Sequence, residues 1–408
     1  MSATQATPRG MRLHIGIFGR RNVGKSSLIN MIANQDVSIV SEVAGATADP
    51  VEKPMELLPL GPVLFIDTAG LDDVGALGKE RALRSRRVFD RTELAILVIA
   101  DNVWGVFEEE VCQEFKGRGV PLLVAFNKCD ETLPSEELVR KIRDDLGLAS
   151  ARISAKDRVG LPELKRLILE NAGDDWFSPA TILSDLIPPD GTAVLVIPID
   201  KEAPKGRLIL PQVQVIRDLL DHGQTALVTR ETELKTALGK LATAPDIVVT
   251  DSQAFQEVAQ KVPREIPLTG FSVLFARLKG DLGVMIEGTR SVAKLKPGAK
   301  ILVAESCSHH PIGEDIGRVK IPRWLTNYVG GALEFHHVQG HDFPENLTQF
   351  DLIIQCGGCM TNRRAILSRI MRAKEQNVPI TNYGLIIAFS LGIFERAVEP
   401  FLPKSMGA

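Results

Sequence analysis

Cysteine is scarce in this chain, which has only five cysteines among 408 residues. A small, odd number of cysteines argues against a disulfide framework, the device by which small secreted domains are stabilised. Neither sign of charge is in excess, since 48 Lys and Arg residues stand against 51 Asp and Glu residues, for a formal net charge of -3. This balance creates no overall field that would attract nucleic acid or an anionic membrane surface.

Long apolar runs are also missing. The longest, residues 385–394, is too short to cross a bilayer and contains Ser390 and Gly392. Residues 1–10 are polar and lack the apolar centre of a secretory signal peptide. We therefore expect a cytoplasmic protein with no membrane segment, whose length suits about three domains.

A phosphate-binding motif opens the chain. Residues 12–18 favour an apolar strand, and residues 19–26 read GRRNVGKS, which fits G-x-x-x-x-G-K-S. A helix is expected over residues 25–33, which gives the motif the strand–loop–helix context that it requires. Lys25 would supply charge to the β- and γ-phosphates, and the Ser26 hydroxyl would bind Mg²⁺. The residues of this loop that are predicted to bind the nucleotide are Gly19, Asn22, Val23, Gly24, Lys25, Ser26 and Ser27.

Further nucleotide-binding elements follow in order. Residues 63–66 favour a buried strand that leads into DTAG at residues 67–70, where Asp67 can hold Mg²⁺ through water and the Gly70 amide can meet the γ-phosphate. Thr47, in a polar loop before this strand, is the candidate switch hydroxyl for Mg²⁺; a simple turn residue is the alternative. The expected catalytic group is Lys25, Ser26, Thr47, Asp67 and Gly70.

Two later motifs predict specificity for guanine. Residues 94–100 and 122–126 are near-continuous apolar runs, as the strands of a buried parallel sheet require. The second run leads into NKCD, whose Asp130 carboxylate can accept hydrogen bonds from guanine N1 and N2, a pair of donors that adenine lacks. A backbone amide in the later SAK motif can reach guanine O6. The predicted base contacts are Asn127, Lys128, Asp130, Ser154, Ala155 and Lys156.

Two residues bear on the mechanism of hydrolysis. Leu71 follows DTAG and cannot orient the attacking water as the Gln of Ras does. This domain resembles the translation-factor-like GTPases, especially the branch of the tRNA-modifying and ribosome-assembly GTPases. Asn22 matches the residue that helps bind K⁺ in the tRNA-modifying relatives, in place of an arginine finger; a loop-shaping Asn is the alternative. The resemblance implies slow, potassium-stimulated hydrolysis of GTP to GDP and phosphate.

The middle of the chain has the sequence pattern of a fold but no motif for catalysis or ligand binding. Residues 171–179 contain Gly, Asp and Pro, which predicts a linker. Strand and helix patterns then alternate from residue 193 to residue 261, which is typical of a parallel α/β unit of about three strands. Because this stretch contains no phosphate-binding motif and no His or Cys cluster, we expect a structural role. Pairing across a dimer would bury the exposed edges of so small a sheet.

Three of the five cysteines lie near the C-terminal end. Residues 356–359 read CGGC, a C-x-x-C turn, and Cys307 forms a C-x-H pair with His309. Strands expected at 300–304 and 351–355 lead into these segments, so both leave the C-terminal ends of strands, where α/β folds bind ligands. Three thiolates suit an iron–sulfur cluster, three thiolates with His suit zinc, and C-x-x-C alone suits thiol redox chemistry. Unconnected buried cysteines are the remaining alternative.

The order of these parts resembles the HydF family of FeFe-hydrogenase maturation GTPases over nearly the whole chain. Residues 203–212, APKGRLILPQ, and residues 356–360, CGGCM, add to the resemblance. It implies a homodimeric scaffold that carries a 4Fe-4S cluster on Cys307, Cys356 and Cys359. It also implies that a di-iron precursor, built with the two radical-SAM maturases, is delivered from this protein to apo-hydrogenase.

Departures and alternatives remain. Many members have His before C-x-x-C, whereas this chain has Gln355, so His309, another side chain or an exogenous ligand is left for the fourth position. We expect an α/β protein: a P-loop GTPase domain at 1–172, then two smaller α/β domains with parallel sheets, for dimerisation at 178–265 and cluster binding at 266–408. The alternative is a GTPase with a structural zinc site that acts in RNA modification or ribosome assembly, which the lack of a basic, aromatic-laced C-terminal region disfavours.

Overall fold

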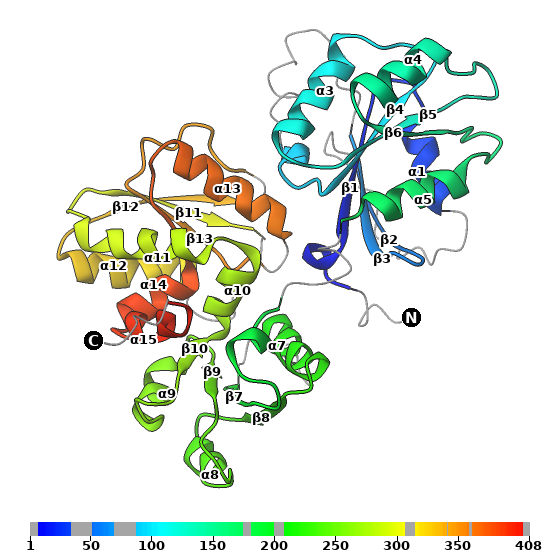
Figure 1. Cartoon of the computed structure of the whole chain (residues 1–408). Coiled ribbons are helices and arrows are strands. Elements are labelled where there is room, and N and C mark those ends of the chain that lie inside the picture. Colours follow the sequence, from blue (N-terminus) through cyan, green and yellow to red (C-terminus); the bar gives the residue numbers. More distant parts are fainter. Residues whose placement is uncertain are drawn as a thin grey trace. The chain divides into compact units, whose positions relative to one another are not determined.

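The structure is a computed structural model, in which two compact units, residues 1–179 and 180–408, are described separately (Figure 1). The described residues are 7–33, 51–68, 87–173, 181–199, 208–306, 315–340, 342–358 and 361–402. Within these ranges, no helix has the length and apolar character needed to cross a membrane.

The first unit is built on a six-stranded sheet with the order β2-β3-β1-β4-β5-β6. Neighbouring strands are parallel except β2 and β3, which are antiparallel. The strands are Leu13–Phe18 (β1), Val51–Leu57 (β2), Gly61–Asp67 (β3), Leu94–Ile99 (β4), Leu122–Phe126 (β5) and Ala149–Arg152 (β6). The helices are Lys25–Ala33 (α1), Val106–Gly117 (α3), Glu136–Arg140 (α4) and Leu161–Asn171 (α5).

Helices cover both faces of this sheet, and this explains its near-continuous apolar strands. Every residue of β1, β4 and β5 is buried. Apolar side chains of α1 and α5, such as Ile32 and Leu164, pack on one face with Ile15 of β1. Side chains of α3 and α4, such as Phe115 and Leu138, pack on the other. The expected parallel α/β fold is therefore confirmed, with one antiparallel edge strand, β2, that the sequence did not predict.

The second unit contains two four-stranded sheets, both entirely parallel. The middle sheet has the order β10-β9-β7-β8, and the C-terminal sheet has the order β12-β11-β13-β14. The strands are Thr192–Val196 (β7), Thr225–Thr229 (β8), Ile247–Thr250 (β9), Leu268–Gly270 (β10), Lys300–Glu305 (β11), Glu334–Gln339 (β12), Leu352–Gln355 (β13) and Ile380–Asn382 (β14). The helices are Leu210–Asp221 (α7), Leu234–Leu238 (α8), Phe255–Lys261 (α9), Phe271–Lys279 (α10), Leu282–Arg290 (α11), Ile321–Val329 (α12), Arg363–Glu375 (α13), Tyr383–Ser390 (α14) and Phe394–Val398 (α15).

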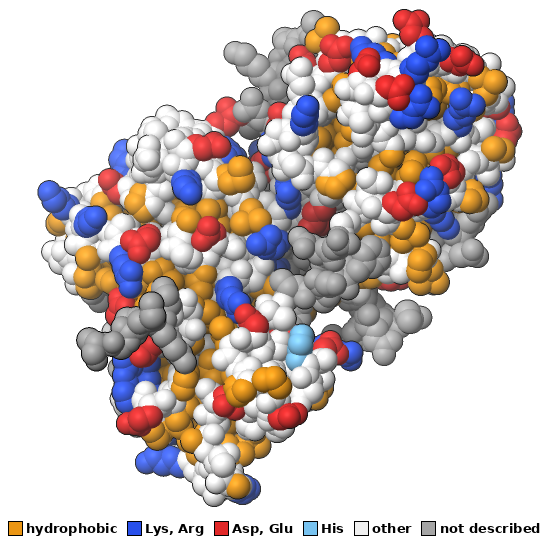
Figure 2. Space-filling model, in the orientation of Figure 1, with side chains coloured by type: hydrophobic (Ala, Val, Ile, Leu, Met, Phe, Trp, Pro, Cys, Tyr) orange, Lys and Arg blue, Asp and Glu red, His pale blue; other side chains and the backbone are white. Residues whose placement is uncertain are grey.

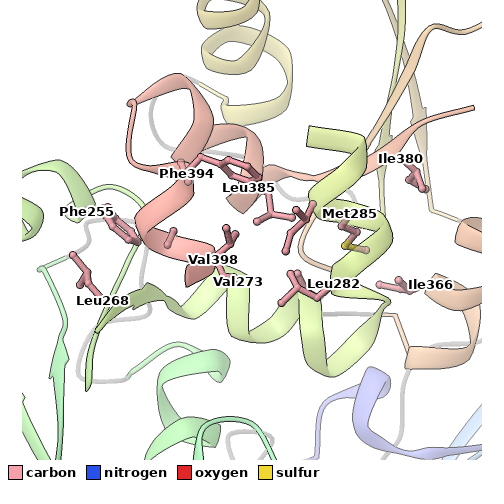
Figure 3. Close-up of a cluster of buried hydrophobic side chains, with 14 of the residues drawn as sticks. Phe255, Leu268, Val273, Leu282, Met285, Ile366, Ile380, Leu385, Phe394 and Val398 are labelled. Carbon is pink, nitrogen blue, oxygen red and sulfur yellow. The ribbon is translucent and has the colours of Figure 1, made fainter. Parts of the chain in front are cut away.

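The two sheets of this unit share one apolar core. Phe255 and Leu268, from the middle sheet and its helices, belong to the same buried cluster as Ile366 and Ile380 from the C-terminal half (Figure 3). The expected count of about three strands in the middle sheet is one too low, because Leu268–Gly270 pairs with β9. The middle sheet thus continues past residue 265, where we placed the end of that domain.

Surface charge agrees with the balanced composition. On the face shown in Figure 2, acidic and basic side chains are interspersed over both units. That pattern is typical of a solvated surface and offers no single-sign field along the visible face.

Candidate functional site

The predicted phosphate-binding loop follows β1, in the position that the motif requires. Lys25 is 8% exposed, and its Nζ donates hydrogen bonds to the carbonyl oxygens of Gly19, at 2.9 Å, and Arg20, at 2.7 Å. Gly24 has a φ of +92°, and a Cβ there would lie 2.2 Å from Nδ2 of Asn127. Both the backbone and the space at this position therefore demand glycine. Backbone amides and a lysine in such a loop suit a phosphate at the start of a helix.

The other residues of this loop differ in burial. Val23 is buried in the core, whereas Asn22 and Ser27 are exposed. Arg20 forms a bidentate pair with the buried Glu108 of α3, with both hydrogen bonds at 2.8 Å. This pair ties the loop to a neighbouring helix, a support that the motif alone did not reveal.

The two described Mg²⁺ candidates are brought together. The Ser26 hydroxyl donates to the Asp67 carboxylate at 2.5 Å, although 41 residues separate them in the sequence. Thr68 anchors the end of β3, because its hydroxyl donates to the carbonyl oxygen of Ile17 on β1 at 2.6 Å. A hydroxyl and a carboxylate side by side are oxygen ligands of the kind that Mg²⁺ prefers. Thr47, Gly70 and Leu71 lie outside the described residues.

Asn127 of the NKCD motif joins the phosphate loop to the base-binding loop. Its Nδ2 donates to the carbonyl oxygen of Val23 at 2.8 Å, and its Oδ1 accepts from the Ala155 amide at 3.0 Å. Lys128 has a φ of +59°, a left-handed backbone that non-glycine residues seldom adopt. The phosphate loop, Asp67, the NKCD motif and the SAK motif therefore converge at the carboxyl ends of the strands.

Asp130 is held ready to accept hydrogen bonds. The Ser154 hydroxyl donates to its Oδ1 at 2.7 Å, and Lys156 Nζ lies 3.7 Å from its Oδ2. The hydrogen bond from Ser154 lowers the pKa of Asp130 below its usual value, so the carboxylate is ionised at neutral pH. An ionised carboxylate is an acceptor-only group, which suits the two donors of guanine.

Replacing Asp130 tests this role. Asp130→Asn is expected to weaken GTP binding relative to xanthosine triphosphate by on the order of 10- to 100-fold, since a hydrogen bond to a charged group is lost with guanine and an amide can satisfy the acceptor of xanthine. A competition binding assay with the two nucleotides measures the preference. Asp144→Asn, an exposed change in the same unit, is the matched control. An unchanged preference in Asp130→Asn would remove Asp130 from the base-binding role.

The C-terminal sheet brings the two cysteine segments to one edge. Strands β11 and β13 are parallel neighbours, with Ala304 paired to Gln355. Cys356 continues this pairing, because its amide donates to the carbonyl oxygen of Ala304 at 2.9 Å. The Ser306 amide in turn donates to Cys356 Sγ at 3.1 Å. The residue directly before Cys307 therefore contacts the sulfur of Cys356, although 50 residues separate the two contacting residues.

A fixed turn follows Cys356. Gly358 has a φ of +61°, and a Cβ there would lie 2.4 Å from Cδ1 of Ile366. Its carbonyl oxygen accepts from the Thr361 amide at 3.1 Å. Asn362 caps the next helix, because its side chain accepts from the Ala365 amide at 3.3 Å. The carbonyl of Gly358 and the amide of Thr361 are thus joined, and Asn362 leads into α13.

Two polar residues beside Cys356 were not predicted. Glu305 is 3% exposed and accepts hydrogen bonds from the Tyr383 hydroxyl at 3.3 Å and from Arg318 at 3.4 Å. Burial, together with the negative charge of Glu305, raises the pKa of Tyr383 above its usual range. Tyr383 therefore stays a neutral hydrogen-bond donor. A glutamate that ends an apolar strand two residues before Cys307 was the available signal for this pair.

Other predicted ligands lie outside the described part of the chain: Cys307, His309 and Cys359. The cysteines that are described, Cys112, Cys129 and Cys356, are free. Among the described residues, which omit those three ligands, no group of three or more His, Cys, Asp or Glu could hold a metal. His336 and His337, on β12, bind Glu334 and the carbonyl oxygen of Gly317 instead.

Comparison with individual proteins identifies relatives of the first unit. The tRNA modification GTPase MnmE of Aeromonas salmonicida is 37% identical over 160 residues, which cover 38% of this chain and 34% of that protein. GTPase Der of Streptomyces coelicolor is 36% identical over 154 residues, covering 35% and 32% respectively. Among solved structures, Era of Aquifex aeolicus bound to GDP and aluminium fluoride has 17% identity and a TM-score of 0.34, covering 80% of this chain and 92% of that chain. The chain spans about a third of the length of MnmE and Der.

Family models match three parts of the chain. The model of the 50S ribosome-binding GTPase matches residues 14–128. The hydrogen maturase F dimerization domain matches residues 182–280, and the hydrogen maturase F tetramerization domain matches residues 283–400. The last two together match more than half of the chain, and they follow a GTPase domain that carries the motifs for binding nucleotide and Mg²⁺. The chain therefore belongs to the hydrogen maturase F (HydF) family of hydrogenase maturation GTPases.

Proposed function

We propose that this GTPase is a scaffold that binds a 4Fe-4S cluster through Cys307, Cys356 and Cys359 and delivers a di-iron precursor to apo-hydrogenase. Its partners are then the hydrogenase apoprotein and the two radical-SAM maturases, and it works in the cytoplasm without binding nucleic acid. The bound cluster would offer an iron with an exchangeable ligand, to which a precursor can attach. His309 is the candidate protein ligand for that fourth position.

One observation carries the proposal: the hydrogen bond from the Ser306 amide to Cys356 Sγ. Hydrogen bonds from backbone amides to the ligand sulfurs are a general feature of iron–sulfur sites and help set their reduction potentials. The contact also supports a site made from both segments, because it brings the chain that enters Cys307 against the sulfur of Cys356. A purely C-x-x-C redox site would not need this neighbour.

The turn after Cys356 fits a bulky bound centre. The left-handed Gly358 folds the chain back, and a Cβ at Gly357 would meet no atom within 4 Å. Gln355 does not take the place of the missing His, because strand alternation puts it on the face of Ile353, which belongs to the shared core, and it is only 1% exposed. The cysteines and open space at this edge suit a cluster with three protein thiolates.

Self-association is provided by the family's own domains, and we propose that the basic assembly is a homodimer formed through the middle sheet. Strand β8 is an edge of that sheet. Val228 on β8 and Leu220 on the adjacent α7 are 46% and 61% exposed. An edge strand with exposed apolar neighbours is a template for pairing with a second copy.

Potassium is expected to stimulate hydrolysis. Asn22 is exposed in the phosphate loop with a φ of +63°, so its side chain is available to a cation beside the phosphates. GTP turnover should be roughly tenfold faster in K⁺ than in Na⁺ at equal ionic strength, on the scale of one added charge-assisted contact. Asn22→Ala should lose the difference. Equal rates in the two salts, or stimulation that survives Asn22→Ala, would contradict the K⁺ site.

The scaffold role is tested by maturation in vitro. Apo-hydrogenase, incubated with the two radical-SAM maturases, GTP and this protein, should gain hydrogen-evolving activity. The same mixture without this protein should stay inactive. If this protein carries the precursor, repurifying it from the maturases before adding apo-hydrogenase should preserve activation. Activation that needs all components present together would contradict a carrier.

A further inference from the structure

Helix α10 joins the two halves of the second unit. It begins at Phe271, directly after strand β10 of the middle sheet. Phe275 packs in the core of the middle sheet, and Val273 packs in the core shared with the C-terminal half (Figure 3). A helix that is apolar on nearly all sides is expected to be buried. Two charged residues lie in its last turn: Arg277, which pairs with Asp185, and the final residue, Lys279, which is only 5% exposed.

Lys279 reaches the C-x-x-C turn. Its Nζ donates to the carbonyl oxygen of Gly358 at 2.6 Å and to that of Thr361 at 2.9 Å. These two carbonyls stand on either side of Cys359 in the sequence. A second contact joins the same elements, because Arg363 Nε at the start of α13 donates to the carbonyl oxygen of Leu278 at 3.1 Å.

The burial of this lysine requires those acceptors. A buried amine without hydrogen bonds is costly, so Lys279 and the turn fix each other's positions. The Gly358 carbonyl accepts from both Lys279 and the Thr361 amide, and the left-handed Gly358 cannot take a side chain. The carbonyl groups of Gly358 and Thr361 are therefore held by Lys279, a residue outside the C-x-x-C motif.

We propose that Lys279 is a positioning residue through which the middle domain holds Gly358 and Thr361, the residues on either side of the segment that contains the proposed ligand Cys359. The model of the dimerization domain ends at residue 280, so this contact reaches from that domain into the segment matched as the tetramerization domain. The middle domain is thus more than the structural unit expected from its sequence. The part of the inference that concerns metal rests on the proposed cluster site; the part that concerns the turn does not.

The test uses the full-length apo protein first. Lys279→Met keeps the length of the side chain and removes every donor. Amide hydrogen exchange in peptides that contain Thr361 should become roughly tenfold faster, because a charge-assisted hydrogen bond to the turn is lost. Thr289→Val is the matched control: it removes a buried hydroxyl in the same unit whose described hydrogen bonds, to Thr381 at 2.6 Å and to the Met285 carbonyl oxygen, involve neither Gly358 nor Thr361. Should Lys279→Met fail to fold, Lys279→Gln, which keeps one donor arm, carries the same test.

The second arm measures metal retention. After anaerobic reconstitution, Lys279→Met should release iron to a chelator roughly tenfold faster than wild type, whereas Thr289→Val should match wild type. Equal exchange at Thr361 in both variants would overturn the positioning role. Faster exchange with unchanged iron release would overturn its link to the metal site. If wild type itself holds no iron, the proposed cluster fails while the exchange experiment still decides whether Lys279 holds the turn.

Discussion

Lys25→Ala is expected to lose on the order of 10²–10³ of the GTP hydrolysis rate and to keep all of its iron, since it removes one preorganised charge from the transferring phosphate. Lys25 is buried in the phosphate loop and bound to two of that loop's own carbonyls, so its side chain is held where the phosphates arrive. The cysteine segments belong to the other compact unit. The nucleotide and metal functions should therefore separate.

Two measurements decide this prediction. Phosphate release under saturating GTP gives the rate, and iron and sulfide analysis after reconstitution gives the metal content. Lys116→Ala, an exposed lysine on α3, is the matched control and should keep both. A Lys25→Ala protein that cannot be reconstituted with iron would show instead that nucleotide binding is needed to build the metal site.

Each of Cys307→Ser, Cys356→Ser and Cys359→Ser is expected to lose most bound iron and all hydrogenase activation. Two remaining thiolates are too few to hold a 4Fe-4S cluster robustly. Cys356→Ser should also replace a sulfur acceptor by a hydroxyl opposite the Ser306 amide. Cys112→Ser is the control, since Cys112 is half-buried on α3 in the first unit, and it should keep its iron. Full iron and full activation in Cys356→Ser would refute the assignment.

His309 is expected to behave differently from the cysteines. His309→Ala should keep a cluster with three thiolate ligands, because water or a small thiol can complete the coordination. Its electron paramagnetic resonance spectrum should change only if His309 binds iron in the resting protein. A His309→Ala protein that loses all iron would make the histidine a structural ligand and remove the exchangeable position.

Elements with strong local signals were predictable from the sequence. Helix α1 and strand β5 have the predicted bounds, because each is an apolar segment beside a motif that fixes one end. In each case the apolar pattern agrees with the residues that mark the ends of the element. Under that condition the bounds of an element can be predicted from its local sequence.

The strands that sequence reasoning missed lie mainly at the edges of their sheets. Strand β2 contains Pro54, which usually argues against a strand but is tolerated at an edge. Strand β12 contains His336 and His337 and is nowhere fully buried, so its pattern is not apolar enough to stand out. Strand β14 has only three residues. These strands form because a neighbouring strand offers a ladder, which is a tertiary effect.

The candidate site likewise contains residues whose roles could be predicted from the sequence and residues whose roles could not. The phosphate and base motifs were readable because each carries its chemistry in adjacent residues. The role of Lys279 could not be predicted, since a lysine at the end of a helix is ordinarily solvated. Its burial depends on Gly358, 79 residues away, and such a contact has no local signature. Glu305 and Tyr383 likewise meet only when the sheet forms.

The most direct test of the central claim is metal and sulfide analysis of wild-type protein purified and reconstituted without oxygen. The account predicts a brown protein with about four iron and four sulfide per chain, which Cys356→Ser does not retain. A colourless protein that holds about one zinc per chain and no sulfide would contradict it, and would make the cysteine site a structural zinc centre.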